Sequence, residues 1–513
     1  MSKIISFTTT PQEGSDLKFI LKKAAQELQV KEEEIIGFKI LKKSIDARKK
    51  KVKILFRAEV SLSQKIEESK IERLYPDVSN AEEVIVIGSG PAGLFAALKL
   101  IELGKKPIVL ERGKEVQERR RDIADINKKH IVNDDSNYCF GEGGAGTYSD
   151  GKLYTRSKKR GSIIDVLETL VFHGATEEIL IDAHPHIGTN KLPKIITSIK
   201  ETIVNSGGIV KFNTKVVDFI IEKNEMKGVL TEAGDKIVAK STILATGHSA
   251  RDIFFLLDKK KVHMDYKPFA MGVRVEHPQA IIDQIQYSCK TRDAHLPAAS
   301  YRLVDQVNGR GVYSFCMCPG GFIVPAATTA GEIVVNGMSP SKRNSEYANS
   351  GIVVEIKEED LIEHHQHGAL KGLYYQMELE KKACSVAQNL QIAPAQRMVD
   401  FVNNKLSSQL NSTSYQPGIL SSQMSDLLPS QITEALKGGF QTFGKKMNGY
   451  YSNQANIIGV ESRTSSPVMI PRDSETLQHI QIKNLYPCGE GAGYAGGIIS
   501  AAIDGEKCAI AAS

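Results

Sequence analysis

The sequence predicts an α/β protein in which a Rossmann-like nucleotide-binding domain carries an inserted α+β domain and follows a small N-terminal α+β domain. Three observations lead to this prediction. From Val84 onward, strand-like and helix-like segments alternate at the spacing typical of a parallel sheet covered by helices. Residues 457–513 return to that pattern after a middle segment of different character. At 513 residues the chain is also too long for a single ordinary core.

The first 75 residues are expected to form the small N-terminal domain. Apolar residues at helical spacing predict an amphipathic helix over residues 16–29. Two segments after Ile35 alternate apolar and charged residues, as half-buried strands do, and residues 46–51 would connect them. Residues 63–83 are charged, contain Pro76 and have weak periodicity, which is typical of a linker.

Residues 83–263 are expected to form the first part of the nucleotide-binding domain, and residues 83–111 contain its most informative motif, EVIVIGSGPAGLFAALKLIELGKKPIVLE. The triplet Gly88, Gly90 and Gly93 follows a strand and opens a helix, at the spacing that lets backbone approach a pyrophosphate. Pro91 suits the first helical turn, where a missing N–H costs nothing. Glu111 ends the second strand, where an acid accepts hydrogen bonds from ribose hydroxyls. Because all parts occur in order, the motif predicts a site for an ADP-containing cofactor.

Further glycine-rich segments lie far from this motif. They are FGEGGAGTYSDGKL at residues 140–153, the strand KIVAKSTILATG at 236–247, and LYPCGEGAGYAGGIISAAIDG at 485–505. With these segments the chain resembles the glutathione-reductase-type FAD-binding fold, and most closely bacterial proteins described only as FAD-dependent dehydrogenases of unassigned substrate. The resemblance implies FAD as cofactor, and an acid at Glu490 that bonds the ribityl chain, although many relatives carry Asp there. The residues that we expect to bind FAD are Gly88, Gly90, Pro91, Ala92, Gly93, Glu111, Arg112, Gly143, Gly144, Thr147, Lys152, Val216, Thr246, Gly247, Gly489, Glu490, Gly496, Gly497 and Ile498.

Two features that other flavoenzymes possess are missing from the sequence. We find no second strand-G-x-G-x-x-G-helix unit, so tightly bound NAD(P)H is not expected, whereas transient NAD(P)H remains an open partner. No C-x-x-C pair follows the first helix, which disfavours the dithiol-disulfide reductases.

The inserted segment, residues 264–456, is expected to form the substrate domain, with strands at 270–275 and 311–324 and helices at 370–391 and 431–446. Several side chains here and nearby have both a structural and a functional interpretation. Cys316 and Cys318 would share a strand face, either as buried thiols or as a redox pair whose mutual disulfide would be strained. Arg274 would pair with Glu276 or bind a substrate carboxylate. Three histidines are structural or lie near the flavin: His184, His186 and His248.

Composition limits the remaining functions. The net charge of +6 is mild for this length and does not demand a nucleic-acid partner. The seven scattered cysteines indicate reduced thiols, and no apolar stretch of membrane-spanning length or secretory core is present, so we expect a cytoplasmic protein without a membrane span.

The sequence therefore predicts an FAD-dependent oxidoreductase, a dehydrogenase or reductase acting on a small molecule through flavin N5, with no metal and no identified catalytic residue. One alternative is a tRNA- or nucleic-acid-modifying flavoprotein that uses the basic cluster of the N-terminal domain, around residues 48–57. Two others are a flavin-dependent hydroxylase and a non-catalytic flavin sensor or scaffold.

Overall fold

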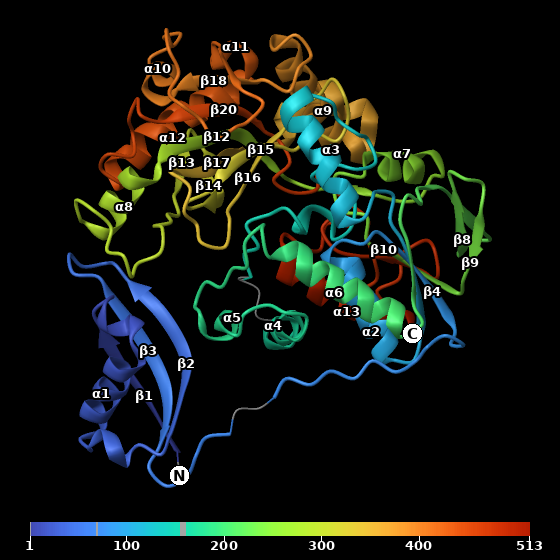
Figure 1. Cartoon of the computed structure of the whole chain (residues 1–513). Helices are drawn as coiled ribbons and strands as arrows, with labels where there is room; N and C mark the ends of the chain where they lie inside the picture. The colour runs from blue at the N-terminus through green and yellow to red at the C-terminus, as the bar shows by residue number, and fades with distance from the viewer. Residues whose placement is uncertain (1, 68–69, 154–160) are drawn as a thin grey trace.

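The computed structural model describes residues 2–67, 70–153 and 161–513. At the N-terminus, strands β1 (Ser2–Thr9), β2 (Gly37–Asp46) and β3 (Lys53–Ser61) form an antiparallel sheet in the order β1-β3-β2, covered by helix α1 (Leu17–Leu28) (Figure 1). The predicted helix and hairpin are present, whereas β1 was not predicted. Its signal is short, since only Ile5, Phe7 and Thr9 alternate as buried residues.

The first α/β segment and the C-terminus together build a five-stranded parallel sheet in the order β22-β10-β4-β5-β6. Its strands are β4 (Glu83–Ile87), β5 (Lys106–Leu110), β6 (Ile209–Lys211), β10 (Ser241–Leu244) and β22 (Leu485–Pro487). Successive strand residues face opposite sides. Val84 and Val86 contact helices α2 (Pro91–Glu102), α4 (Ile163–Phe172), α6 (Leu192–Asn205) and α13 (Ile498–Ala512) in one hydrophobic cluster.

The other face of this sheet is covered by a different layer. Ile85 and Ile87 pack toward helix α7 (Arg251–Lys259) and a small antiparallel sheet of β7 (Val216–Glu222), β8 (Glu225–Thr231) and β9 (Lys236–Val238). Apolar residues on both faces explain the unbroken run VIVI in β4, because a buried parallel strand needs no polar side.

The middle of the chain forms a seven-stranded sheet in the order β13-β14-β17-β12-β20-β18-β19. Its strands are β12 (Ala270–Pro278), β13 (Val304–Val307), β14 (Arg310–Cys318), β17 (Tyr347–Glu355), β18 (Ala393–Arg397), β19 (Ile419–Ser421) and β20 (Asn456–Glu461). β20 pairs with β12 and β18, so the boundary that we expected after residue 456 is wrong and this sheet continues to Glu461. The partners of this strand are remote in sequence, so the local pattern does not show the pairing.

The remaining helices and strand pairs complete the fold. The helices are α3 (Val116–Lys129), α5 (Glu178–Ile181), α8 (Gln279–Tyr287), α9 (Lys371–Val386), α10 (Met398–Val402), α11 (Met424–Leu427) and α12 (Ser430–Lys446). The strand pairs are β11 (Asp265–Tyr266) with β21 (Val468–Met469), and β15 (Phe322–Pro325) with β16 (Val335–Met338). Within the described ranges, no helix has both the length and the apolar character needed to cross a bilayer.

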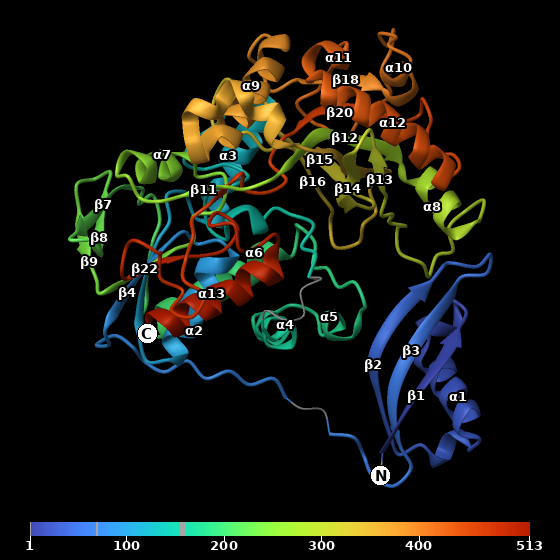
Figure 2. The same ribbon diagram turned by 180° about the vertical axis from the view of Figure 1, so that it is seen from behind.

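The N-terminal sheet lies beside the rest of the chain and is joined to it by an extended segment (Figure 2). The Ala183 N–H donates to the Lys43 carbonyl oxygen at 2.9 Å, which attaches strand β2 to the segment after α5. Ala47 and Val52, at the tip of the β2–β3 hairpin, belong to the same hydrophobic cluster as the seven-stranded sheet. The hairpin is therefore attached to the segment that follows α5.

Candidate functional site

A cavity of about 1080 Å³ lies between the five-stranded and seven-stranded sheets. Its wall includes the residues at the carboxyl ends of four parallel strands: Gly88 after β4, Glu111 after β5, Thr246 after β10 and Glu490 after β22. In open α/β sheets, ligands bind at this end of the strands. The opposite wall is built by β14 and by the loop around Arg343.

Two glycines allow the turn after β4 to pack closely against its neighbours. Gly88 has φ +100°, and a Cβ there would lie 2.5 Å from the Ala245 carbonyl oxygen. A Cβ at Gly93 would lie only 1.9 Å from the Gly88 carbonyl oxygen. Helix α2 can therefore approach the turn closely only because Gly93 lacks a side chain, and the turn can approach the end of β10 only because Gly88 lacks one.

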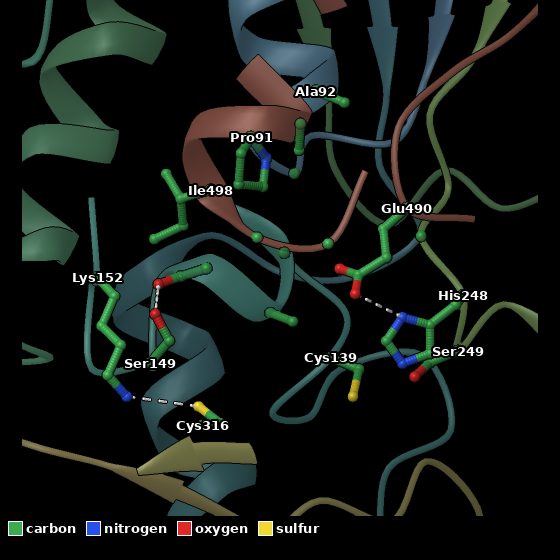
Figure 3. A pocket seen from close by; sticks show the side chains of 18 of the residues that line it. Pro91, Ala92, Cys139, Ser149, Lys152, His248, Ser249, Cys316, Glu490 and Ile498 are labelled. Atoms are coloured by element: carbon green, nitrogen blue, oxygen red, sulfur yellow. Dashed lines mark hydrogen bonds and ion pairs between the residues drawn. The ribbon is translucent and has the colours of Figure 1, made fainter. Parts of the chain in front are cut away.

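Two helices begin at the cavity with glycine as the capping residue. Gly90 precedes α2 and Gly497 precedes α13, and neither offers a side chain to the first N–H groups of its helix. Pro91, Ala92 and Ile498 from these first turns line the cavity (Figure 3). Helix N-termini of this kind favour phosphate and other anions, because free N–H groups and the helix dipole both present positive charge.

Glu111 lines the cavity, but its carboxylate is already bonded to the protein. One oxygen accepts hydrogen bonds from the Ser89 N–H and hydroxyl, at 2.9 and 2.8 Å. The other accepts from the N–H groups of Gly113 and Gly141, both at 2.9 Å. Glu111 thus fixes the glycine turn to the neighbouring loops. The sequence predicted only a contact with a ribose and not this structural role.

Glu490 and His248 are neighbours in the cavity wall, with 3.6 Å between Glu490 Oε1 and His248 Nδ1 (Figure 3). Burial raises the pKa of Glu490 to about 7, despite the opposing charge of Lys267. Burial, together with the charges of Arg463 and Arg251, lowers the pKa of His248 to about 4. At neutral pH the pair therefore consists of a neutral histidine and a carboxyl group that titrates in the physiological range.

At the opposite wall, Lys152 reaches β14. Its Nζ lies 3.7 Å from the Sγ atoms of both Cys316 and Cys318, and 3.7 Å from an oxygen of Asp150. Arg343 donates to Asp150 at 2.9 Å. Burial opposes ionisation of Asp150, but the cations of Lys152 and Arg343 still hold its pKa below the ordinary value. This end of the cavity therefore brings two cations, a carboxylate and a thiol together.

Most residues predicted to bind the cofactor meet at this one cavity. Those in its wall are Gly88, Gly90, Pro91, Ala92, Glu111, Arg112, Gly144, Lys152, Val216, Thr246, Gly247, Glu490, Gly496, Gly497 and Ile498. Others of the predicted set lie behind the described wall: Gly93, Gly143, Thr147 and Gly489. The Thr147 hydroxyl donates to the Glu142 carbonyl and the Gly489 N–H donates to Asp504, so these residues shape the loops from outside the cavity.

The other candidates separate into structural and cavity-lining residues. Arg274 is fully buried and pairs with Glu461 at 2.6 Å, whereas Glu276 bonds Ser414, so the expected pairing of Arg274 with Glu276 is wrong. The reason is that β20, next to β12, presents Glu461 to Arg274. His184 lines the cavity, while the His186 ring bonds the Ser341 carbonyl at 3.0 Å.

Several cavity residues were missed by the sequence interpretation. They come from the inserted segment or its contacts: Asp150, Tyr301, Arg302, Phe315 and Arg343. No local pattern identifies Tyr301, Arg302 or Arg343, which the tertiary fold brings to the cavity.

The residues present fit FAD. Uncapped helix starts suit the pyrophosphate, and an added Cβ at Gly247, Gly496 or Gly497 would have no neighbour within 4 Å, so backbone at these cavity positions is open to a flat ring system. The volume is large enough for a cofactor together with a small molecule.

Comparisons with known proteins agree with this fit. Residues 83–119 match the family model "FAD binding domain", residues 268–464 match "FAD-dependent protein, C-terminal domain-like", and residues 1–61 match a domain of unknown function (DUF8436).

Among individual proteins, an uncharacterized protein of Clostridium beijerinckii is 40% identical over 96% of this chain and 95% of its own length. The tRNA uridine 5-carboxymethylaminomethyl modification enzyme MnmG of Alkaliphilus metalliredigens is 29% identical, but over only 32% of this chain and 24% of the enzyme. Glycine oxidase from Bacillus cereus is a solved structure that matches 83% of this chain and 94% of its own, with 13% identity and a TM-score of 0.30. The chain therefore belongs to the same family of uncharacterised FAD-dependent proteins as the Clostridium beijerinckii protein, and FAD is its cofactor.

Proposed function

We propose that this chain is an oxidoreductase, a dehydrogenase or a reductase, that moves hydride between a small molecule and N5 of its FAD. One observation carries the proposal: a single cavity runs from the helix starts of α2 and α13 to the side chains of β14 and Arg343. FAD supplies the two-electron chemistry when bound. The chain supplies a second, chemically different compartment beside it, which a protein that only stored the cofactor would not need.

In the proposed architecture the cofactor compartment belongs to one domain, and a second domain covers it. A glutathione-reductase-type FAD-binding domain is formed by residues 83–263 and the C-terminal segment, and an inserted α+β domain from residue 264 to about Glu461 covers it. Residues 1–75 form the small N-terminal domain. The separate hydrophobic clusters of the five-stranded and seven-stranded sheets support the division between the first two of these domains.

The side chains of the second compartment favour an anionic substrate. Lys152, Arg302 and Arg343 contribute positive charge, and among the described wall residues at this end Asp150 opposes it. Tyr301 and Phe315 add apolar surface. A small molecule with a carboxylate or phosphate and an apolar portion would be bound and oriented by this set, with water excluded by the two rings.

Glu490 is the residue best placed to hold or deliver a proton during the reaction. Its carboxyl group lines the cavity and has a pKa of about 7, which matches a general acid or base at physiological pH. His248 beside it is neutral at that pH and offers a hydrogen bond rather than a charge.

The test is anaerobic reduction of the purified yellow protein, with flavin absorbance followed after adding NADH or NADPH. Rapid bleaching would establish a reductase or hydroxylase driven by pyridine nucleotide, and in a separate aerobic assay NAD(P)H oxidation with oxygen uptake and no added substrate would point to the hydroxylase. An intact flavin that neither cofactor bleaches would favour a dehydrogenase reduced by its own substrate. A protein without flavin and without affinity for FAD would refute the proposal.

The partial similarity to MnmG favours one further candidate, a nucleic-acid-modifying flavoprotein. Lys49, Lys50 and Lys51 are exposed at the hairpin tip of the N-terminal sheet and could recruit a polyanion. This candidate predicts tRNA binding that weakens steeply with salt and is lost when the three lysines become alanine. Replacing the exposed helix residues Lys18 and Lys22 provides the matched control.

A further inference from the structure

Two cysteines of β14 lie at the cavity in an unusual backbone geometry. β14 pairs with β17, but the register shifts between Phe315 and Cys318, which marks a β-bulge. Cys316 lies in this bulge with φ +46°, a left-handed conformation that is rare for residues other than glycine. Such backbone strain is commonly found at functional sites, where a bulge redirects a side chain.

The two thiols occupy different depths. Cys316 lines the cavity, whereas Cys318 is completely buried behind it. The Cys318 Sγ lies 3.3 Å from the Cys316 carbonyl oxygen, to which the Arg274 guanidinium also donates at 3.3 Å. This arrangement places one accessible thiol in front of one protected thiol.

Lys152 holds a positive charge against both sulfurs, with Nζ at 3.7 Å from each (Figure 3). A hydrogen bond from the Cys318 thiol lowers the pKa of Cys316 well below the ordinary value, and the cations of Lys152 and Arg274 act in the same direction against burial and Asp150. The same hydrogen bond and burial raise the pKa of Cys318. The surroundings therefore favour ionisation of Cys316 over that of Cys318.

Other cysteines lack this combination. Cys139 also lines the cavity, but its Sγ lies 3.9 Å from the Ala326 carbonyl oxygen, which is not a cation. Cys384 is buried and bonds only a backbone carbonyl within the described contacts. Buried structural thiols resemble Cys384, whereas Cys316 has the cation, the accessible surface and the neighbouring thiol that reactive cysteines have.

We propose that Cys316 and Cys318 are a redox-active pair that reduces a small disulfide bound in the cavity, with Cys316 as the attacking and Cys318 as the resolving cysteine. This inference deepens the proposed oxidoreductase function and rests on it, because the reduced FAD of that function would supply the electrons.

The reaction balances in two stages. The Cys316 thiolate attacks one substrate sulfur, the substrate S–S bond breaks, and one half leaves as a thiolate. Cys318 then attacks the Cys316 sulfur; its proton goes to the second substrate half, which leaves as a thiol, and a Cys316–Cys318 disulfide remains. Two electrons and one proton return the pair to thiolate and thiol, which is what two-electron-reduced flavin delivers.

The short spacing suits such a cycle. A disulfide between residues two apart in a strand departs from relaxed geometry, and strained disulfides are the ones most readily reduced. The spacing that argued for structural thiols is therefore compatible with a bond that forms and opens repeatedly.

The test uses full-length, flavin-loaded protein in which Cys139 and Cys289, the other partly exposed cysteines, are serine. The probe is the aromatic disulfide 5,5′-dithiobis(2-nitrobenzoate), which releases a coloured thiolate. We expect two equivalents of coloured thiolate per chain, no retained adduct, and a Cys316–Cys318 disulfide in the mass spectrum. In Cys318→Ser we expect one equivalent and a mixed disulfide retained on Cys316.

Lys152 is tested by rate. At pH 7 the Lys152→Met variant should react about tenfold more slowly or worse, because an ordinary thiol is only a few per cent ionised at that pH. Lys215→Met is the matched control, since Lys215 lines the same cavity but pairs with Asp135 and Glu232, and its rate should not change.

Electron transfer is measured separately on the oxidised protein. Anaerobic photoreduction of the flavin should be followed by return of the yellow absorbance as the disulfide opens and two thiols reappear. An adduct retained on Cys316 in the parent protein, or thiols that react only after unfolding, would overturn the inference even if NAD(P)H bleaches the flavin. Thiols that exchange as expected in a chain with no affinity for FAD would instead refute the proposed function and, with it, the source of electrons.

Discussion

At the scale of single residues, Glu490 shows how burial converts an ordinary acid into a group that titrates at neutral pH. Because the folded chain raises its pKa from 4.5 to about 7, the folded state binds more protons than the unfolded state between these values. The stability of the flavin-free protein therefore falls as pH rises through this interval, and the full penalty is present above about pH 7.

Glu490→Gln removes that penalty. We expect the variant and the parent to have equal stability at pH 5, and the variant to be more stable by ~1–3 kcal/mol at pH 8, measured by urea unfolding of flavin-free protein. Glu434→Gln, at an exposed carboxylate, is the control and should show no pH-dependent difference. An equal gain at both pH values would mean that charge at Glu490 is not the cause.

Gly93 and Gly496 separate packing from cofactor contact. Gly93→Ala places a Cβ 1.9 Å from the Gly88 carbonyl oxygen and should cost about 3 kcal/mol or more of folding stability. Gly496→Ala meets no atom within 4 Å but intrudes on the cavity, so it should leave the unfolding of flavin-free protein unchanged and weaken FAD binding by roughly 5- to 100-fold. Calorimetric titration with FAD and unfolding of both variants distinguish the two effects.

The cavity residues that could be predicted from the sequence are those that belong to short sequence motifs. The glycines of the first turn, Glu111 and the C-terminal Gly-Glu pair follow from short motifs, because each motif is one strand, one turn and one helix start. Arg343 and the lysine contact of Cys316 could not be predicted, since the residues that meet there are separated by more than 150 positions.

At the scale of elements, a buried ionic network joins helix α7, helix α9 and the segment after β20. Glu380 of α9 accepts from Arg251 of α7 and from Arg463, both at 2.8 Å, and Glu332 bonds the same two arginines. The two cations lower the pKa of Glu380 to about 2 against the effect of burial. Its contribution to stability is therefore complete above about pH 4.5 and is lost as pH falls toward 2.

Glu380→Gln keeps the size of the side chain but leaves two buried arginines with one carboxylate. We expect a loss of ~3–5 kcal/mol in the free energy of unfolding at pH 7. The surface variant Glu434→Gln should cost less than about 0.5 kcal/mol. Comparable losses in the two variants would show that the network is no stronger than a surface ion pair.

Helices and strands were predicted correctly where the apolar periodicity is strong. They were missed where the element is defined by pairing with a strand that is remote in sequence. Helices α1, α2 and α12 match the predicted segments, since each has a clear apolar face. Strand β1 has only a short alternation and is held by eight residues of pairing with β3, which the sequence does not display. β20 lies beyond the boundary expected at residue 456 for the same reason, because its partners β12 and β18 are remote in sequence.

At the scale of the whole molecule, the cavity belongs to no continuous part of the chain. Residues from the first nucleotide-binding segment, the inserted sheet and the C-terminal helix all contribute to its described wall, whereas none from the N-terminal sheet does. A chain ending at residue 484 lacks β22 and α13, and we expect it to be purified without flavin. A chain lacking residues 1–61 should retain flavin, and absorbance at the flavin bands relative to protein checks both expectations.

The position of β22 at one edge of the parallel sheet has a consequence for biosynthesis. Its neighbour β10 and the glycine turn after β4 leave the ribosome long before it, yet they cannot close the cofactor site until β22 and α13 have been translated. Until then the edge of β10 has no strand paired to it on that side. Flavin capture therefore requires translation of residues 485–512, and a nascent chain that stalls before them is left with an exposed strand edge that chaperones and proteases recognise.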